Sequence, residues 1–127
     1  MDGTPRLLLW NYSEEELTLV SQVLEAVKAP PAVSIRKDQG YLLLKEIIHT
    51  DKRAEQEFEC DEKVILFYNI PNKGMSFLID LAKRKQLPVS IYASVTEHSI
   101  EWPFNELVEE LVTEREAFRQ AAKQNET

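Results

Sequence analysis

The chain has few of the residues that build disulfide-bonded or metal-binding folds. Its 127 residues include one cysteine, Cys60, and two histidines. A single cysteine excludes an intrachain disulfide and a multi-cysteine zinc site, and two histidines add too few ligands for a metal cage. The three glycines are also too few for a glycine-rich dinucleotide fingerprint. We therefore expect no metal and no cofactor.

Basic residues and long apolar runs are scarce as well. Fifteen Lys and Arg face 22 Asp and Glu, which gives a net charge of −7. This charge repels phosphate backbones and anionic lipid, so we expect neither nucleic acid nor membrane as a partner. No segment approaches membrane-spanning length, and residues 1–5 lack the pattern of a secretory signal. These features predict a cytoplasmic protein.

The rest of the composition is that of a globular domain. Hydrophobic residues make up 43% and charged residues 29% of the chain. No linker or repeat divides the sequence, so residues 1–127 are predicted to form a single α/β domain with a frayed polar end at 120–127. Four short apolar segments are typical of β-strands, at residues 6–10, 32–36, 63–70 and 87–95.

Helical patterns separate these strands. Ser13, with Glu16 three residues later, has the spacing of a capping box, and the helix that it opens stops at Pro30. Residues 41–49 favour a short helix, although 41–44 is also a plausible strand. A third helix ends in Lys83, Arg84 and Lys85. A long final helix follows Pro103, which suits a first helical position.

Alternating strands and helices predict parallel pairing through right-handed crossovers. The expected fold is therefore a three-layer α/β sandwich, with helices on both faces of a four-stranded parallel sheet of order 2-1-3-4. Ligands of such sheets bind at the carboxyl ends of the strands, where the order reverses. The loops after the first, third and fourth strands supply the candidate ligand-binding residues Asn11, Ser13, Asn69, Asn72, Lys73, Thr96 and His98.

Most of these residues also have a structural explanation. Ser13 caps a helix, and Asn69 and Asn72 suit a turn. Lys73 at a helix start could hold an anion. His98 could act as a general acid or base if a carboxylate such as Glu97 set its pKa.

Two further residues bear on packing and assembly. Trp102 precedes the last helix, where its ring is expected to pack on the sheet as a hydrophobic staple. Phe118 continues the apolar stripe of that helix toward its polar end. If it has no partner within the chain, it marks a homodimer contact.

Residues 64–114 resemble a small prokaryotic domain of unknown function, number 3783. The likeness rests on the strand at 64–68, the Ala93-Ser94-Val95-Thr96 strand end, and Trp102 before an acidic helix. Thr96 and Trp102 match by position, whereas His98 or Ser99 stands where the family has an asparagine. The family has no assigned activity, so the resemblance implies a fold and a prokaryotic origin but no chemistry.

Residues 69–74 and the segment after them are also similar to a response-regulator receiver. The phospho-acceptor aspartate of that fold corresponds to Asn69, and its magnesium-binding acids correspond to Asn11 and Tyr12. An amide cannot form an acyl phosphate, and no metal is held without carboxylates. The resemblance implies at most a degenerate receiver used for contacts.

Three functions remain open from the sequence. The first is a non-catalytic module that acts through protein contacts or regulation, which the lack of a nucleophile–base or metal constellation favours. The second is a binder of a small molecule or anion at the carboxyl edge of the sheet. The third is an enzyme that uses His98 as acid or base.

Overall fold

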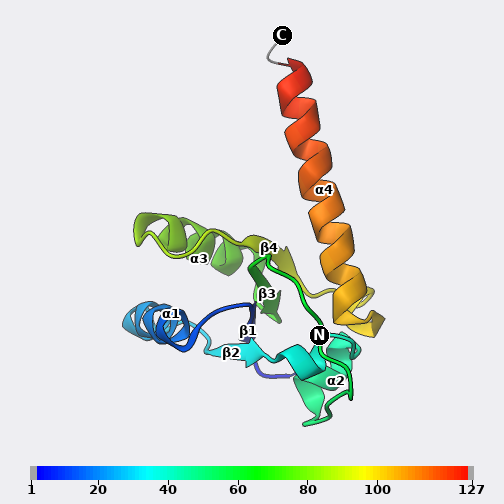
Figure 1. The fold of residues 1–127 in the computed structure, drawn as a ribbon. Coiled ribbons are helices and arrows are strands. Elements are labelled where there is room, and N and C mark those ends of the chain that lie inside the picture. Colours follow the sequence, from blue (N-terminus) through cyan, green and yellow to red (C-terminus); the bar gives the residue numbers. More distant parts are fainter. Residues whose placement is uncertain (1–2, 126–127) are drawn as a thin grey trace.

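The computed structural model describes residues 3–125, which form an α/β fold around a four-stranded sheet (Figure 1). The strands are β1 (Arg6–Trp10), β2 (Ala32–Ile35), β3 (Val64–Tyr68) and β4 (Ile91–Ser94). They lie in the order β2-β1-β3-β4. This order confirms the predicted sequence of strands across the sheet.

The predicted all-parallel sheet is wrong, because the sheet is mixed. β1 is parallel to β2 and β3 is parallel to β4, but β1 and β3 are antiparallel, with Leu8 opposite Leu66. The reason lies in the connection from β2 to β3. After a short helix, α2 (Leu44–His49), an extended segment at 50–63 brings the chain back to the edge of the sheet where β2 ended. β3 therefore starts beside the end of β1.

Contacts along this connection show the reversal. The Arg6 guanidinium, at the start of β1, donates to the carbonyl of Ile48 at 3.1 Å. Thirteen residues later, the carbonyl of Asp61 accepts from the Asn11 amide, just past the end of β1, at 2.9 Å. The charged composition of the 50–63 segment is typical of a solvated connection, but the segment runs the length of the sheet.

The other helices are α1 (Glu14–Ala26), α3 (Asn72–Arg84) and α4 (Phe104–Asn125), with 3-10 turns η1 (Lys37–Gln39) and η2 (Ser99–Glu101). The capping box of Ser13 and Glu16 is confirmed. The helical interpretation of 41–49 is confirmed from Leu44 onward. α4 begins one residue after Pro103 and continues through much of the segment predicted to fray. Residues 126–127 of that segment lie outside the described part.

Alternate side chains of the central strands enter two apolar layers. Leu7, Leu9, Ile65 and Phe67 pack against α1 and α3. Leu8, Trp10, Val64, Leu66 and Tyr68 pack on the opposite face against α2 and the start of α4. Every residue of β3 is buried, as expected for a strand covered by helices on both faces. The prediction of helices on both faces is therefore confirmed.

Candidate functional site

In the mixed sheet, the predicted ligand-binding residues lie at the two opposite ends of the strands, so they are divided between two edges. Asn11 and Ser13 follow β1 at one edge. The residues that follow β3 and β4 lie at the opposite edge, because these strands run against β1. They are Asn69, Asn72, Lys73, Thr96 and His98. The structure does not bring the three loops together, so the predicted common pocket does not form.

At the β1 edge, the candidate residues hold the entry of β3 against the exit of β1. The Lys63 ammonium donates to the Asn11 carbonyl at 2.6 Å and pairs with the Glu16 carboxylate at 2.9 Å. The Ser13 hydroxyl accepts from the Glu16 backbone N–H at 3.1 Å. The Ser13 backbone N–H and the Lys63 ammonium both hold the pKa of Glu16 below its ordinary value. Asn11 and Ser13 therefore have structural partners.

A cavity of about 280 Å³ lies at the carboxyl ends of the parallel pair β1 and β2. Asn11, Arg36, Lys37 and Glu59 are among its lining residues. The Lys37 ammonium pairs with the Glu59 carboxylate at 3.2 Å, and the Arg36 guanidinium lies 3.6 Å from an Asp38 oxygen. Its cations thus already face acids within the chain. The sequence analysis missed this cavity because it expected a site where the carboxyl ends of the first and third strands meet.

At the opposite edge, the candidates form turns and caps. The Asn69 amide donates to the Gly3 carbonyl at 2.6 Å. The Thr96 N–H donates to the Ser99 hydroxyl at 2.9 Å, and the Ser99 N–H donates to the Thr96 hydroxyl at 3.0 Å. These reciprocal bonds close the turn that leads into η2. Asn72 and Lys73 begin α3 and are exposed.

His98 gains no catalytic partner from this arrangement. Its side chain is exposed, and its ring packs edge-on against Trp102 with 5.5 Å between centroids. Trp102 in turn is partly buried and packs against the core cluster at the base of α4, as the staple interpretation expects. Within residues 3–125, no carboxylate bonds to the His98 ring, and no three His, Cys, Asp or Glu side chains are grouped to hold a metal ion.

The far part of α4 is exposed to solvent on all sides. Phe104, Leu107 and Val108 are buried at its start, and Leu111 and Val112 are partly buried. From Glu116 to Gln124 every side chain is exposed, and the helix rises away from the sheet (Figure 1). We call residues 116–124 the α4 arm. Phe118 lies on this arm with 78% of its surface exposed.

One continuous segment of the chain matches a family model. Residues 63–118 match the model of a domain of unknown function (DUF3783). The DUF3783 segment begins at Lys63, contains β3, α3, β4 and η2, and ends at Phe118 within α4. The predicted resemblance is thus confirmed. No curated protein and no solved structure matches the chain significantly. No helix in the described part is long and apolar enough to span a membrane.

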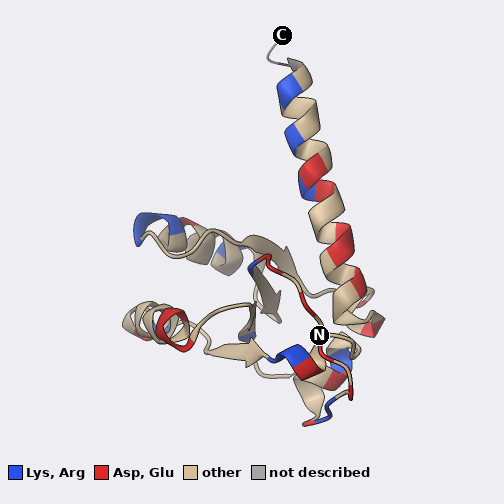
Figure 2. Ribbon diagram, viewed as in Figure 1, with Lys and Arg blue, Asp and Glu red and all other residues tan. Residues whose placement is uncertain are grey.

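Charge is distributed unevenly along α4 (Figure 2). Residues 104–116 carry Arg115 and five acids, which are Glu106, Glu109, Glu110, Glu114 and Glu116. Residues 117–124 carry Arg119 and Lys123 and no acid. This order suits the helix dipole, which favours cations near the carboxyl end. It also gives the helix an acidic and a basic half.

Arg115 makes the last contact between α4 and the rest of the fold. Its partner lies in the segment that leads into β3. Its guanidinium forms a bidentate salt bridge with the Glu62 carboxylate, at 2.6 and 2.7 Å. The hydrogen bonds from Arg115 hold the pKa of Glu62 below its ordinary value. This pair fixes the direction in which the α4 arm leaves the sheet.

We expect the Arg115–Glu62 pair to stabilise the fold only above acidic pH. Because the pKa of Glu62 is lowered on folding, its stabilisation is present above the unfolded pKa and is lost as pH falls through the folded one. Since the pair is partly exposed, Glu62→Gln should reduce the free energy of unfolding at pH 7 by only about 0.5–1 kcal/mol. Urea unfolding of both proteins at pH 7 and about pH 3 measures this, and the difference should be smaller at the lower pH. An unchanged difference would mean that the charge of Glu62 is not responsible.

Proposed function

We propose that this protein is a non-catalytic α/β module that acts through protein–protein contacts, and that the α4 arm joins two copies of the chain. The exposed ring of Phe118 carries the proposal. Large apolar side chains on a regular surface element are typical of association sites when they continue a buried stripe. Leu107 and Leu111 form the buried and half-buried part of that stripe, and Phe118 lies two turns beyond Leu111.

The lack of packing contacts along the α4 arm supports the presence of a partner. Helices in water gain most of their stability from packing, and short segments without it are marginal. The arm extends α4 beyond its last partly buried residue, Arg115, by nine residues whose side chains are all exposed. Packing of Phe118 and Ala121, which are three residues apart and share one face, against a second helix would supply the missing contacts.

The charges favour an antiparallel arrangement of two arms. In an antiparallel pair centred on Phe118, Lys123 of one chain lies near Glu114 and Glu110 of the other, and Arg119 lies near Glu116. A parallel pair would instead set like charges opposite one another. Arg119 is paired with Glu116 of its own helix at 3.1 Å, but this exposed pair contributes little and can exchange for an intermolecular one.

The test is the mass of the protein in solution. We expect the wild-type chain to approach twice its 14.7 kDa mass with increasing concentration in sedimentation or light-scattering measurements. Phe118→Asp should weaken self-association by at least about 100-fold, because each dimer buries two rings worth about 1.5–3 kcal/mol each. Gln120→Asp is the matched control, since it adds the same charge about 200° around the helix from Phe118.

Two results would contradict the proposal. A wild-type chain that stays monomeric at the highest concentration measured would show that the arm does not join copies of the chain. An equal loss of association in Phe118→Asp and Gln120→Asp would show that added charge, rather than the apolar contact, controls assembly.

A further inference from the structure

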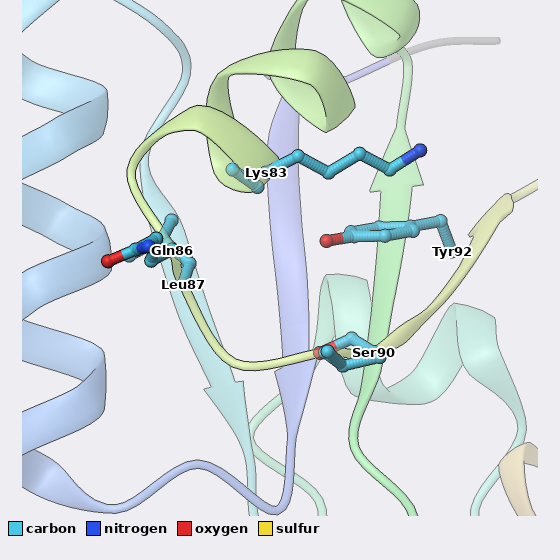
Figure 3. A pocket seen from close by; sticks show the side chains of 7 residues that line it. Lys83, Gln86, Leu87, Ser90 and Tyr92 are labelled. Carbon is cyan, nitrogen blue, oxygen red and sulfur yellow. The ribbon is translucent and has the colours of Figure 1, made fainter.

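A second candidate surface lies on the DUF3783 segment, beside the outer strand β4. A cavity of about 400 Å³ opens between the end of α3, the connection that follows it, and the start of β4. Leu87, Val89 and Tyr92 give it apolar walls, and Lys83 lies at its rim. Figure 3 shows the Lys83 side chain extended alongside the Tyr92 ring. Val89 is 93% exposed. We call this cavity the β4 groove.

The β4 groove lies beside a concentration of positive charge. Lys83, Arg84 and Lys85 follow one another at the end of α3 and colour that end of the helix blue in Figure 2. Within residues 3–125, no acidic side chain forms an ion pair with any of the three. Elsewhere in this chain of net charge −7, cations such as Lys63 and Arg115 have acidic partners.

The backbone of β4 offers hydrogen bonds at the same place. β4 is an outer strand of the sheet. The N–H groups of Ile91 and Val95 donate toward β3, to the carbonyls of Lys63 and Phe67, each at 2.9 Å. Successive residues of a strand point their backbone groups in opposite directions, so the N–H groups of Tyr92 and Ser94 face away from β3. An outer strand of this kind is a template for an added strand.

We propose that the β4 groove and the outer edge of β4 bind an extended acidic segment of a partner protein. The segment adds a strand beside β4, places one apolar side chain against Leu87 and Tyr92, and sets its carboxylates near Lys83 and Arg84. Charge complementarity selects the acidic partner, because no acidic side chain of the described residues forms an ion pair with Lys83, Arg84 or Lys85. This surface is separate from the α4 arm, so the two contacts are independent.

The probe is a fluorescein-labelled peptide of sequence EDELEDE, followed by fluorescence anisotropy. We expect binding that weakens at least ten-fold in the variant Lys83→Gln/Arg84→Gln/Lys85→Gln, and similarly in Val89→Asp. Lys73→Gln is the control, because Lys73 is an exposed cation at the other end of α3. Phe118→Asp should bind the peptide as the wild type does, which separates this proposal from self-association. Thermal unfolding of each variant checks that it folds.

Hydrogen exchange tests the geometry of the complex. Bound peptide should slow exchange of the Tyr92 and Ser94 amides, and unchanged exchange would rule out strand addition. The neutral peptide QNQLQNQ should bind at least ten-fold more weakly. Equal binding of the two peptides, equal binding by the triple variant, or tighter binding of a single-stranded oligonucleotide than of EDELEDE would each overturn the proposal.

Discussion

Replacing Phe104 by alanine is expected to lower the free energy of unfolding by about 3–5 kcal/mol, the usual cost of removing a buried aromatic ring. Phe104 is completely buried, and its ring lies 5.2 Å from that of Trp10 and 6.3 Å from that of Phe58. Its backbone N–H donates to the Leu42 carbonyl at 2.9 Å. The residue thus joins the first turn of α4 to the sheet and to the loop before α2.

Urea unfolding followed by circular dichroism measures this loss. Phe77→Ala is the matched control, because Phe77 is 49% exposed on α3 and should cost about 1 kcal/mol or less. If Phe104→Ala cost no more than Phe77→Ala, the packing of α4 on the sheet would be contradicted. Because Phe104 lies at the base of α4, its loss should also reduce any self-association through the α4 arm.

Local patterns were sufficient to predict most of the elements. Ser13 and Glu16 identified the start of α1 because a capping box acts within one turn. The continuous apolar run at 64–68 identified β3 as a central strand, since only a strand covered on both faces buries every residue. The strand order was also predicted correctly: the crossovers through α1 and α3 each lead to a neighbouring strand, whereas β2 and β3 lie on either side of β1.

The direction of β3 could not be predicted from such patterns. It depends on the 50–63 segment, whose charged residues indicated a solvated connection. Phe58 is the one aromatic residue there, and its ring contacts those of Trp10 and Tyr41 at 5.3 and 5.5 Å. Phe58 and Cys60 pack against the core cluster and hold the segment along the sheet, and two residues are too few to show a periodicity. Phe58, an apolar residue within an acidic run, was the available signal that this segment packs against the sheet.

The candidate site depended on that direction. Once β3 is antiparallel to β1, Asn11 and Asn69 lie at opposite edges, and each bonds the backbone of the segment that faces it. The helix dipole by itself favours cations at the end of α3, so their presence in the sequence did not indicate a site. Only the fold shows that Lys83 borders a cavity at the outer strand, because Tyr92 and Val89 come from the following segment.

Gly40→Ala is expected to destabilise the fold by about 1–3 kcal/mol, the usual cost of overpacking a core. A Cβ at Gly40 would overlap the Cβ of Phe58 and approach its Cγ and Cδ2 to 2.9 Å. The backbone at Gly40 has φ −64 and ψ −22, which alanine adopts without strain. Alanine there would gain about 0.4–1 kcal/mol from the reduced entropy of the unfolded chain. The steric cost is larger, because a Cβ attached to the main chain cannot rotate away.

A second glycine gives a control of opposite sign. Gly74 lies in the first turn of α3, and the nearest atom to an added Cβ is the Ile70 Cγ2 at 3.2 Å, which has to move by only a few tenths of an ångström. Gly74→Ala should therefore be neutral or stabilise the protein by up to about 1 kcal/mol, as in other helix interiors. In thermal unfolding, we expect a lower Tm for Gly40→Ala than for the wild type, and an unchanged or higher Tm for Gly74→Ala. If both variants were equally stable, Phe58 would not pack against Gly40, and the 50–63 segment would lack one of the contacts that hold it along the sheet.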